Sequence, residues 1–434
     1  MSLAKIVHRS EKSFKVEIEV SYKKSMLEGE EAIQEAINQA GCLMTGEMLC
    51  QFDTDGSPIM IGGVKWTSKG LISKTYQTPY GEAEIERHIY QSPKGGAGFC
   101  PLERDARIIL TATPKFAKIL ASKYAEFGSS RVNDDLEGNH GRKVARSFIQ
   151  NVCDAVGAVA IAKEGEWEYA VPETEKPIKT ISVGLDGTCM LMMEEGYRQA
   201  MVGTIALFDK EGERQFTLYT AAAPEYGKKT FLQRLDNEVS KMKERYPNAH
   251  FVGLADGARD NWDFLETRTD TQIIDFYHVT EYLSKASEGM FPGKKNLTKK
   301  QEWLDNACHN LKHTPGTPLH LLNELKSFLE TNTASADERE QLQKTITYLE
   351  NNKHMMNYPE AVSQNLPIGS GVTEAACKVI VKQRLCSAGM KWKERGAAVV
   401  LSLRSLSYTT KRWYQFWEKK LTGLDFLLQH SWFI

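Results

Sequence analysis

The chain has 434 residues, 41% of them hydrophobic and 26% charged, which are the fractions of a folded globular protein and not of a disordered one. Its formal net charge of −1 gives no overall attraction to nucleic acid, so any nucleic-acid-binding surface has to be local. No apolar run reaches the roughly 18 residues of a membrane span, and eight cysteines without a C-x-x-C pair disfavour both a zinc ribbon and a disulfide framework. These features predict a protein of the reducing cytoplasm with no membrane partner.

Residues 1–113 are predicted to form a small α+β domain. Phe14–Val20 alternates apolar and polar side chains as a strand does, and a helical stripe begins at Met26, with its predicted end at Gly41. Tyr80–Tyr90 alternates like a strand that has one solvent-facing side.

Residues 114–165 are predicted to form a helix-turn-helix. A helix over Phe116–Phe127 is followed by a short segment over Val132–Gly141 and then by a helix that begins at Arg142. A buried stripe in that last helix leaves several polar side chains near its N-terminal end, where a recognition helix meets bases and phosphates. The candidate DNA-binding residues are Arg142, Lys143, Arg146 and Gln150. The alternative is an ordinary helical hairpin with a solvated basic face.

Residues 166–179 are polar, contain two prolines and are predicted to link this part to a mixed α/β domain. Three successive strands are predicted there, then helix, strand, helix and strand, which gives a mixed sheet covered by helices. This is the order of the ribonuclease H fold, in which the first and fourth strands carry adjacent acids. The predicted strands are 181–185, 201–208, 216–220, 250–255 and 272–277, and the longer helix is 228–245.

The catalytic domain is predicted to consist of residues 180–285 and 366–420, with a helical insertion at 286–365 and a C-terminal tail at 421–434. The inserted stretch is charged and has the apolar spacing of helices. It separates two candidate acids by 118 residues (374 − 256), which is too long for a bare loop in a compact domain.

Three acidic residues are candidates for one site. Asp186 follows the apolar run Thr180–Leu185, Asp256 follows a second apolar run, and Glu374 lies where a helix begins. One Asp-Gly after a strand is more often a turn than a ligand, but three acids in this order are less easily accidental. Carboxylate oxygens suit hard cations, and two such ions can hold the attacking and leaving oxygens of an in-line displacement. The sequence therefore predicts a two-metal site, with Asp186 between the metals and Gly187 turning the backbone away from the DNA.

The segment after the third acid is basic and aromatic. Between residues 378 and 420, eleven lysines and arginines stand against two glutamates, with tryptophans among them. Phosphate neutralisation together with stacking surfaces indicates nucleic-acid binding, and a solvated helix face is the alternative. The candidate residues are Lys378, Lys382, Arg384, Lys391 and Trp392.

The segments that contain the acids have a specific combined pattern, found in Gly184–Thr188, Ala255–Trp262, Asp275–Leu283 and Gly369–Lys378. Together they resemble the ISKra4 family of bacterial insertion-sequence transposases, a group related to the Mutator-like branch of the DDE transposases. The resemblance extends upstream and downstream of these segments and covers most of the chain.

The resemblance implies a ribonuclease H-like DNA transposase that binds the terminal inverted repeats of its element and performs cleavage and strand transfer. Asp186, Asp256 and Glu374 match the acids that bind two Mg²⁺ ions, for which Mn²⁺ can substitute, and His278 matches a D-x-x-H motif near the scissile phosphate. The implied partners are double-stranded DNA, both transposon ends and target, and further copies of the chain in a homodimer or larger oligomer. The implied location is the bacterial cytoplasm, at the nucleoid.

Two other functions also fit the sequence. A domesticated or inactive relative would bind DNA without cutting it, although the intact acids argue against this. A ribonuclease H-fold nuclease would cut branched or hybrid substrates without strand transfer, although the predicted helix-turn-helix and insertion favour recognition of specific ends.

Overall fold

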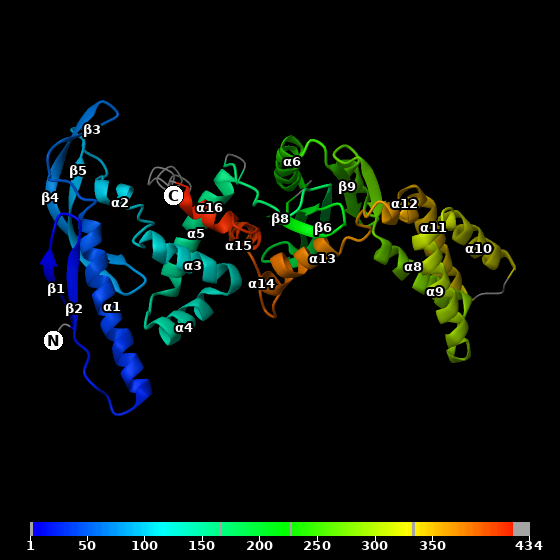
Figure 1. The fold of residues 1–434 in the computed structure, drawn as a ribbon, viewed down its shortest axis with the longest axis horizontal. Helices are drawn as coiled ribbons and strands as arrows, with labels where there is room; N and C mark the ends of the chain where they lie inside the picture. Colours follow the sequence, from blue (N-terminus) through cyan, green and yellow to red (C-terminus); the bar gives the residue numbers. More distant parts are fainter. Residues whose placement is uncertain (1–2, 165–166, 226–227, 332–334, 420–434) are drawn as a thin grey trace. The chain divides into compact units, whose positions relative to one another are not determined.

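The computed structural model describes residues 3–164, 167–225, 228–331 and 335–419 (Figure 1). These residues form two compact units, each built from segments that are far apart in the sequence. The first unit comprises the described residues within Met1–Glu168, Ala398–Ser407 and Trp413–Ile434. The second comprises those within Tyr169–Ala397 and Tyr408–Arg412. The predicted tail at 421–434 lies outside the described residues.

The first unit begins with strands and one long helix. β1 pairs with β2, and β3, β4 and β5 follow one another in a second antiparallel sheet. On β5, buried Ala83, Ile85 and Arg87 alternate with exposed glutamates, so the predicted one-sided strand is confirmed. The elements are β1 (Ala4–Arg9), β2 (Phe14–Ile18), α1 (Met26–Cys50), β3 (Ile59–Ile61), β4 (Val64–Gln77), β5 (Glu82–Gln91) and α2 (Pro101–Asp105).

Helix α1 continues well past Gly41, so the predicted helix end is wrong. The ring of Tyr80 occupies the space beside Gly41, and a Cβ added there would lie 2.2 Å from Cγ of Tyr80. Gly41 therefore permits close packing of a ring against the helix backbone, and a glycine with that role is compatible with a helix interior.

Three helices follow in the order that was predicted, but the third begins later. Gly141 ends α4 in the left-handed conformation (φ 61°), and the chain then runs in a non-helical segment to Arg146. Arg142 and Lys143 therefore precede the helix that was expected to begin with them. The helices are α3 (Pro114–Glu126), α4 (Ser129–His140) and α5 (Arg146–Lys163).

Part of the range 366–420, which the sequence assigned to the catalytic domain, packs in the first unit. Gly157 of α5 lies against Val399, and buried Arg404 donates from Nη1 to the carbonyl of Ala125 at 2.6 Å and to Glu126 Oε2 at 2.9 Å. The helices concerned are α15 (Glu394–Tyr408) and α16 (Arg412–Glu418), of which residues 398–407 and those from Trp413 onward belong to this unit.

The second unit is built on a mixed five-stranded sheet with the strand order β10-β9-β6-β7-β8. β7 is antiparallel to both β6 and β8, whereas β9 is parallel to β6 and β10 is parallel to β9. The predicted mixed α/β class is confirmed. The strands are β6 (Thr180–Met192), β7 (Gly196–Phe208), β8 (Arg214–Ala222), β9 (His250–Ala255) and β10 (Thr271–Ile274).

Two strand ends differ from the prediction. β6 does not end before Asp186, because pairing with β7 continues to Met192. β10 ends at Ile274, and the chain enters a helix there because the Asp275 side chain accepts a hydrogen bond from the His278 N–H at 2.9 Å. His278 is therefore in the first turn of a helix.

Residues 286–365 are helical for most of their length, and their apolar side chains join the core of the sheet. Leu311, Leu325, Leu342 and Leu349 are buried in the same cluster as the strand residues. Figure 1 shows these helices extending from one end of the sheet. Among the described residues, no helix is both long and apolar enough to cross a membrane. Helices α6 (Lys229–Arg245) and α7 (Arg259–Leu265) precede this range, and the helices that run into it or lie within it are α8 (Phe276–Met290), α9 (Leu297–His313), α10 (Thr317–Thr331), α11 (Ala336–Asn352) and α12 (Tyr358–Ser363).

The chain then returns to the sheet through one continuous helical segment. α13 (Gly371–Ala376) is followed without a break by a π-helical turn (Cys377–Lys382) and by α14 (Gln383–Leu385). Beyond it the chain meets the end of β6, where the Trp392 N–H donates to the Leu191 carbonyl at 3.0 Å.

The close contact at Gly41 predicts opposite effects for two substitutions in α1. Gly41→Ala should lower the free energy of unfolding by about 1–3 kcal/mol, because the added methyl group would overlap the Tyr80 ring. Gly29→Ala should raise it by up to about 1 kcal/mol, because nothing lies within 4 Å of that position and alanine favours the helix. Urea unfolding followed by circular dichroism measures both, and equal signs would contradict the packing described here.

Candidate active site

Asp186 lies within β6, just beyond the end of its pairing with β9. The parallel pairing ends at Gly184 and Leu254, whereas the antiparallel pairing with β7 continues past Asp186, which is opposite Val202. The prediction that the backbone turns away at Gly187 is wrong, because the strand continues through this residue. Gly187 instead faces Gln199 on β7, whose Cδ would lie 2.2 Å from an added Cβ.

Asp256 directly follows β9, the strand next to β6. Its Oδ1 accepts a hydrogen bond from the Ala258 N–H at 3.1 Å, and its carbonyl accepts one from Trp262 Nε1 at 2.8 Å. These bonds fix the turn into α7. Because β9 and β6 run parallel and side by side, their carboxyl-terminal ends bring Asp256 and Asp186 to the same edge of the sheet.

Glu374 reaches the same edge from α13. This helix lies close to the sheet because Gly184 has no side chain: an added Cβ would lie 2.2 Å from Oγ1 of Thr373. The Thr373 hydroxyl is also within hydrogen-bond distance of the Thr204 hydroxyl on β7, at 2.7 Å. The residue before Glu374 thus anchors the helix, and Glu374 itself is exposed beside the other two acids.

A buried carboxylate connects the start of α8 to the start of α13. Asp275 is 1% exposed and accepts hydrogen bonds from the His278 N–H and, at 2.6 Å, from the Ser370 N–H. The Ser370 hydroxyl lies between two carboxylates, Asp275 Oδ2 and, at 3.2 Å, Glu374 Oε1. Asp275 is therefore a positioning residue for both His278 and Glu374.

The three predicted acids line one cleft of about 770 Å³, together with His278. The cleft opens at the edge of the sheet where β6 and β9 meet α13. Its lining residues are Leu185, Asp186, Gly187, Thr188, Ala255, Asp256, His278, Ser370, Thr373, Glu374, Cys377, Lys378, Lys382 and Gln383. The acids come from segments up to 188 residues apart (374 − 186), so the fold brings them together.

The electrostatics of this cleft disfavour negative charge on Asp186. Burial raises the pKa of this carboxyl, and the nearby charge of Asp256 raises it further, against the lowering effect of the hydrogen bond from the Gly187 N–H. The Cys377 thiol lies 3.6 Å from Asp186 Oδ2, and burial together with Asp186 raises the pKa of that thiol. Cys377 is accordingly a neutral donor to the carboxylate.

The donor set of the cleft has the chemistry of a site for hard cations. Carboxylate oxygens are the ligands that Mg²⁺ and Mn²⁺ prefer, and a cation between Asp186 and Asp256 would relieve the repulsion that raises the pKa of Asp186. In the conformation that the structure describes, no three His, Cys, Asp or Glu side chains of the described residues are grouped closely enough to hold an ion. Asp186, Asp256 and the exposed Glu374 are the residues that would hold it.

His278 also lines the cleft and is half-buried against two aromatic rings. Its ring centroid lies 5.4 Å from that of Tyr282 and 5.8 Å from that of Tyr348. Its Nδ1 is 3.7 Å from Glu281 Oε2. The ring is therefore fixed by its neighbours and presents a polar edge beside the acids.

The candidate DNA-binding residues after Glu374 have two different environments. Lys378 and Lys382 are exposed, four positions apart, and line the acid cleft, and Lys391 is exposed as well. Arg384 is 3% exposed, and its guanidinium lies 5.1 Å from the ring centroid of half-buried Trp392. The fold thus uses Arg384 and Trp392 for internal packing, and leaves the lysines at the surface.

The candidates in the first unit are also divided. Arg142 is buried, and its guanidinium donates to Gln77 Oε1 at 2.9 Å and to the Thr78 carbonyl at 3.2 Å. Lys143 is exposed and pairs with Glu137, while Arg146 and Gln150 are exposed on α5. Arg142 therefore connects two parts of the first unit, and the exposed candidates are those at 143, 146 and 150.

Several residues that shape the cleft were not assigned a role from the sequence. Ser370 and Thr373 lie in the same Gly369–Lys378 segment as Glu374, but their contacts, Asp275 and Thr204, are distant in the chain. The local signal for such a role is only that both residues are polar and close to a candidate acid, since Ser370 precedes Glu374 by four positions and Thr373 by one.

In comparisons with known proteins, no protein-family model and no curated protein matches the chain.

The repulsion between Asp186 and Asp256 predicts a pH-dependent gain in stability for Asp256→Asn. A carboxyl with a raised pKa destabilises the folded chain when it is ionised, and this penalty disappears as the pH falls through the folded-state pKa. In EDTA at pH 7, the variant should gain about 1 kcal/mol or less, because Asp186 remains partly exposed to solvent. The amide oxygen can still accept from the Ala258 N–H.

Thermal unfolding at pH 7 and at pH 4 measures this gain, which should be smaller at pH 4. Asp260→Asn is the control, because Asp260 is exposed and lies 3.8 Å from Lys228. A gain for Asp256→Asn that does not change with pH would contradict the assignment to Asp186.

Proposed function

We propose that the chain is a DDE transposase of the ISKra4 kind, which binds the terminal inverted repeats of its element and catalyses metal-dependent DNA cleavage and strand transfer. The observation on which the proposal rests is that Asp186, Asp256 and Glu374, from three distant segments, line a single cleft with His278. Three carboxylates that can bind divalent ions at a sheet edge are the ligands that a phosphodiester-cleaving enzyme needs.

The sheet supports a ribonuclease H-like core. Its strands follow the order 3-2-1-4-5 when counted from β6 in chain order, with the first three antiparallel and the last two parallel to the first. This is the strand plan of the ribonuclease H fold. Asp186 on the first strand, Asp256 directly after the fourth and Glu374 on a later helix support the proposal.

The chemistry divides between the acids and the surrounding polar groups. Divalent ions held by Asp186, Asp256 and Glu374 would activate the attacking oxygen and stabilise the leaving oxygen. Lys378 and Lys382 provide positive charge beside the acids, where a DNA phosphate would otherwise be repelled. Ser370 is hydrogen-bonded to Glu374, and His278 adds an imidazole ring to the lining of the same cleft.

Amide replacements test the acids directly. Asp186→Asn, Asp256→Asn and Glu374→Gln should each reduce Mg²⁺-dependent cleavage of terminal-repeat DNA by at least about 1000-fold, because each removes one charged ligand from the transition state. Binding of the same DNA in Ca²⁺ or EDTA should remain. Asp260→Asn, at an exposed acid of α7 outside the cleft, is the matched control and should cleave normally.

A second readout is independent of activity. Mg²⁺ should raise the melting temperature of the native chain and leave that of Asp186→Asn unchanged. Cleavage without joining would identify a nuclease, and binding without cleavage would identify an inactive DNA-binding relative. Undiminished cleavage in any of the three acid variants would remove that residue from the site.

The two lysines beside the acids predict a change in salt dependence. Lys378→Ala together with Lys382→Ala should weaken DNA binding and reduce the slope of log K against log salt by about 1.8, since each phosphate contact contributes about 0.9. Lys210→Ala, at a cation on the β7–β8 turn whose side chain is 81% exposed, should leave the slope unchanged. An unaltered slope in the double variant would place the phosphates elsewhere.

A further inference from the structure

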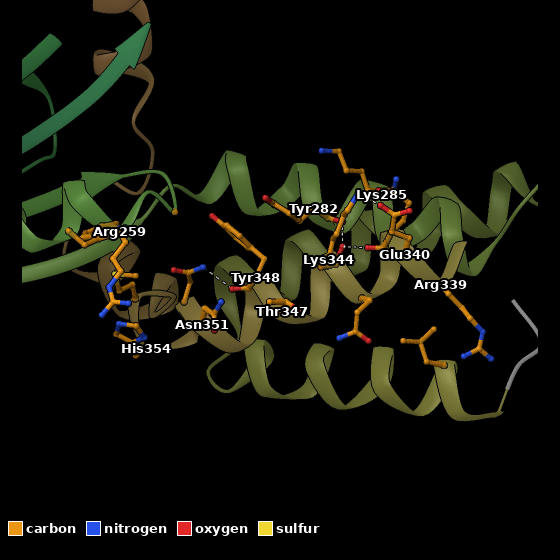
Figure 2. A pocket seen from close by; sticks show the side chains of 18 of the residues that line it. Arg259, Tyr282, Lys285, Arg339, Glu340, Lys344, Thr347, Tyr348, Asn351 and His354 are labelled. Atoms are coloured by element: carbon orange, nitrogen blue, oxygen red, sulfur yellow. Dashed lines mark hydrogen bonds and ion pairs between the residues drawn. The ribbon is translucent and has the colours of Figure 1, made fainter. Parts of the chain in front are cut away.

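A second, larger groove lies next to the acid cleft in the second unit, and the proposed chemistry does not use it (Figure 2). Its volume is about 1370 Å³, and it is formed by the turn after Asp256, by α7, α8 and by the length of α11. Small-molecule sites usually measure about 300–1,000 Å³, so this groove fits an extended ligand better. We call it the α11 groove.

The α11 groove contains an aromatic pair that also contacts the acid cleft. Tyr282 of α8 and Tyr348 of α11 stack with centroids 3.9 Å apart and planes 11° apart. His278, which lines the acid cleft, packs edge-on against both rings. Gly257 lines the groove one residue after Asp256. The two sites are therefore continuous through these residues.

Tyr348 has a polar group that the protein leaves unsatisfied. Its side chain is 9% exposed, and its hydroxyl oxygen is buried without a hydrogen-bond partner among the described residues. Buried hydroxyl groups normally have a partner, so a ligand that could supply one is favoured here. Exposed Asn351 lies on the next part of the same helix and adds an amide donor and acceptor to the groove (Figure 2).

Positive groups are distributed along the length of the groove. Figure 2 shows Arg259 at one end, Lys285 further along and Arg339 at the other end. Within the described part of the chain, Arg259, Lys285 and Arg339 form no ion pair with an acid. The acids that line the groove are Asp263, Glu266 and Glu340, and Glu340 is paired with Lys344. Lys285 Nζ lies 5.3 Å from the Tyr282 ring centroid. Spaced cations with aromatic rings between them suit a chain of phosphates and bases, and not a compact anion.

We propose that the α11 groove binds single-stranded DNA that continues from the scissile phosphate in the acid cleft. The inference rests on the proposed function, which places a DNA strand in that cleft. Bases lie against the tyrosine pair, the Tyr348 hydroxyl and Asn351 contact base edges, and the cations contact phosphates. Base faces and edges reach such a pair only when they are unpaired, so the ligand is a single strand and not a duplex.

The first test measures binding of a fluorescein-labelled (dT)15 oligonucleotide to the full chain in EDTA over a range of salt. Lys285→Ala with Arg339→Ala should weaken binding about tenfold and lower the salt slope by about 1.4, at about 0.7 for each single-strand phosphate. Lys295→Ala with Lys299→Ala is the matched control, because both lysines are exposed near α9 and neither lines the groove. Equal losses in the two double variants, or none in the first, would overturn the proposal.

A second test separates stacking from charge. Tyr282→Leu should weaken (dT)15 binding about tenfold, whereas Tyr282→Phe should preserve it, because only the ring face is needed. With 5-iododeoxyuridine in the strand, ultraviolet crosslinks should map to Tyr282 or to peptides of α11. Crosslinks confined to other segments, or a duplex that binds as tightly as the single strand and with the same dependence on Tyr282, would exclude the single-strand groove.

The two proposals can fail separately. Asp186→Asn should bind (dT)15 at least as tightly as the native chain, because in EDTA the substitution only removes a negative charge that repels a phosphate. Groove variants that lose oligonucleotide binding in a chain that never cleaves DNA would support the groove and refute the transposase. If the acid variants lose cleavage and the groove variants bind the oligonucleotide like the native chain, the transposase is supported and the groove is refuted.

Discussion

The buried carboxylate of Asp275 is the interaction on which the candidate site depends. A carboxylate removed from water is costly unless its oxygens are hydrogen-bonded, and Asp275 accepts bonds from two backbone N–H groups and lies against the Ser370 hydroxyl. One of these N–H groups begins α8 and the other precedes α13. The cost of burying this carboxylate is therefore offset only when the first turn of α8 and the residue before α13 both lie against it. His278 and Glu374, on separate helices, thereby acquire a defined separation across the cleft.

Much of the second unit could be predicted from the sequence, because its signals are local. Alternation and apolar runs indicated the strands, and the residues that follow two of these apolar runs are the acids at the sheet edge. Strand ends were less predictable, since β6 continues past Asp186 only because β7 extends beside it. The arginines were least predictable. A guanidinium is usually solvent-exposed, and the burial of Arg142 depends on Gln77 and Thr78, more than 60 residues earlier in the chain.

The cleft concentrates opposing charges in a chain that is almost neutral overall. Burial and the charge of Asp256 raise the pKa of Asp186, and Lys382 on the adjacent helix lowers it. The Cys377 thiol lies 3.6 Å from Asp186 Oδ2. Its raised pKa keeps it neutral, so it adds no further negative charge beside this carboxylate. The unliganded cleft is thus less stable than an apolar edge would be. This is the usual relation between a functional site and the fold that supports it.

The π-helical turn at Cys377–Lys382 sets the direction in which the residues beyond the third acid face. The Gln383 N–H bonds to the Lys378 carbonyl five residues earlier, so this turn holds one residue more than an α-helical turn does. If the same residues were wound as an ordinary α-helix, everything beyond the turn would be rotated by about 100° relative to Glu374. Arg384 would then lose its packing against Trp392. The winding of this turn therefore relates the position of the third acid to that of the packed arginine.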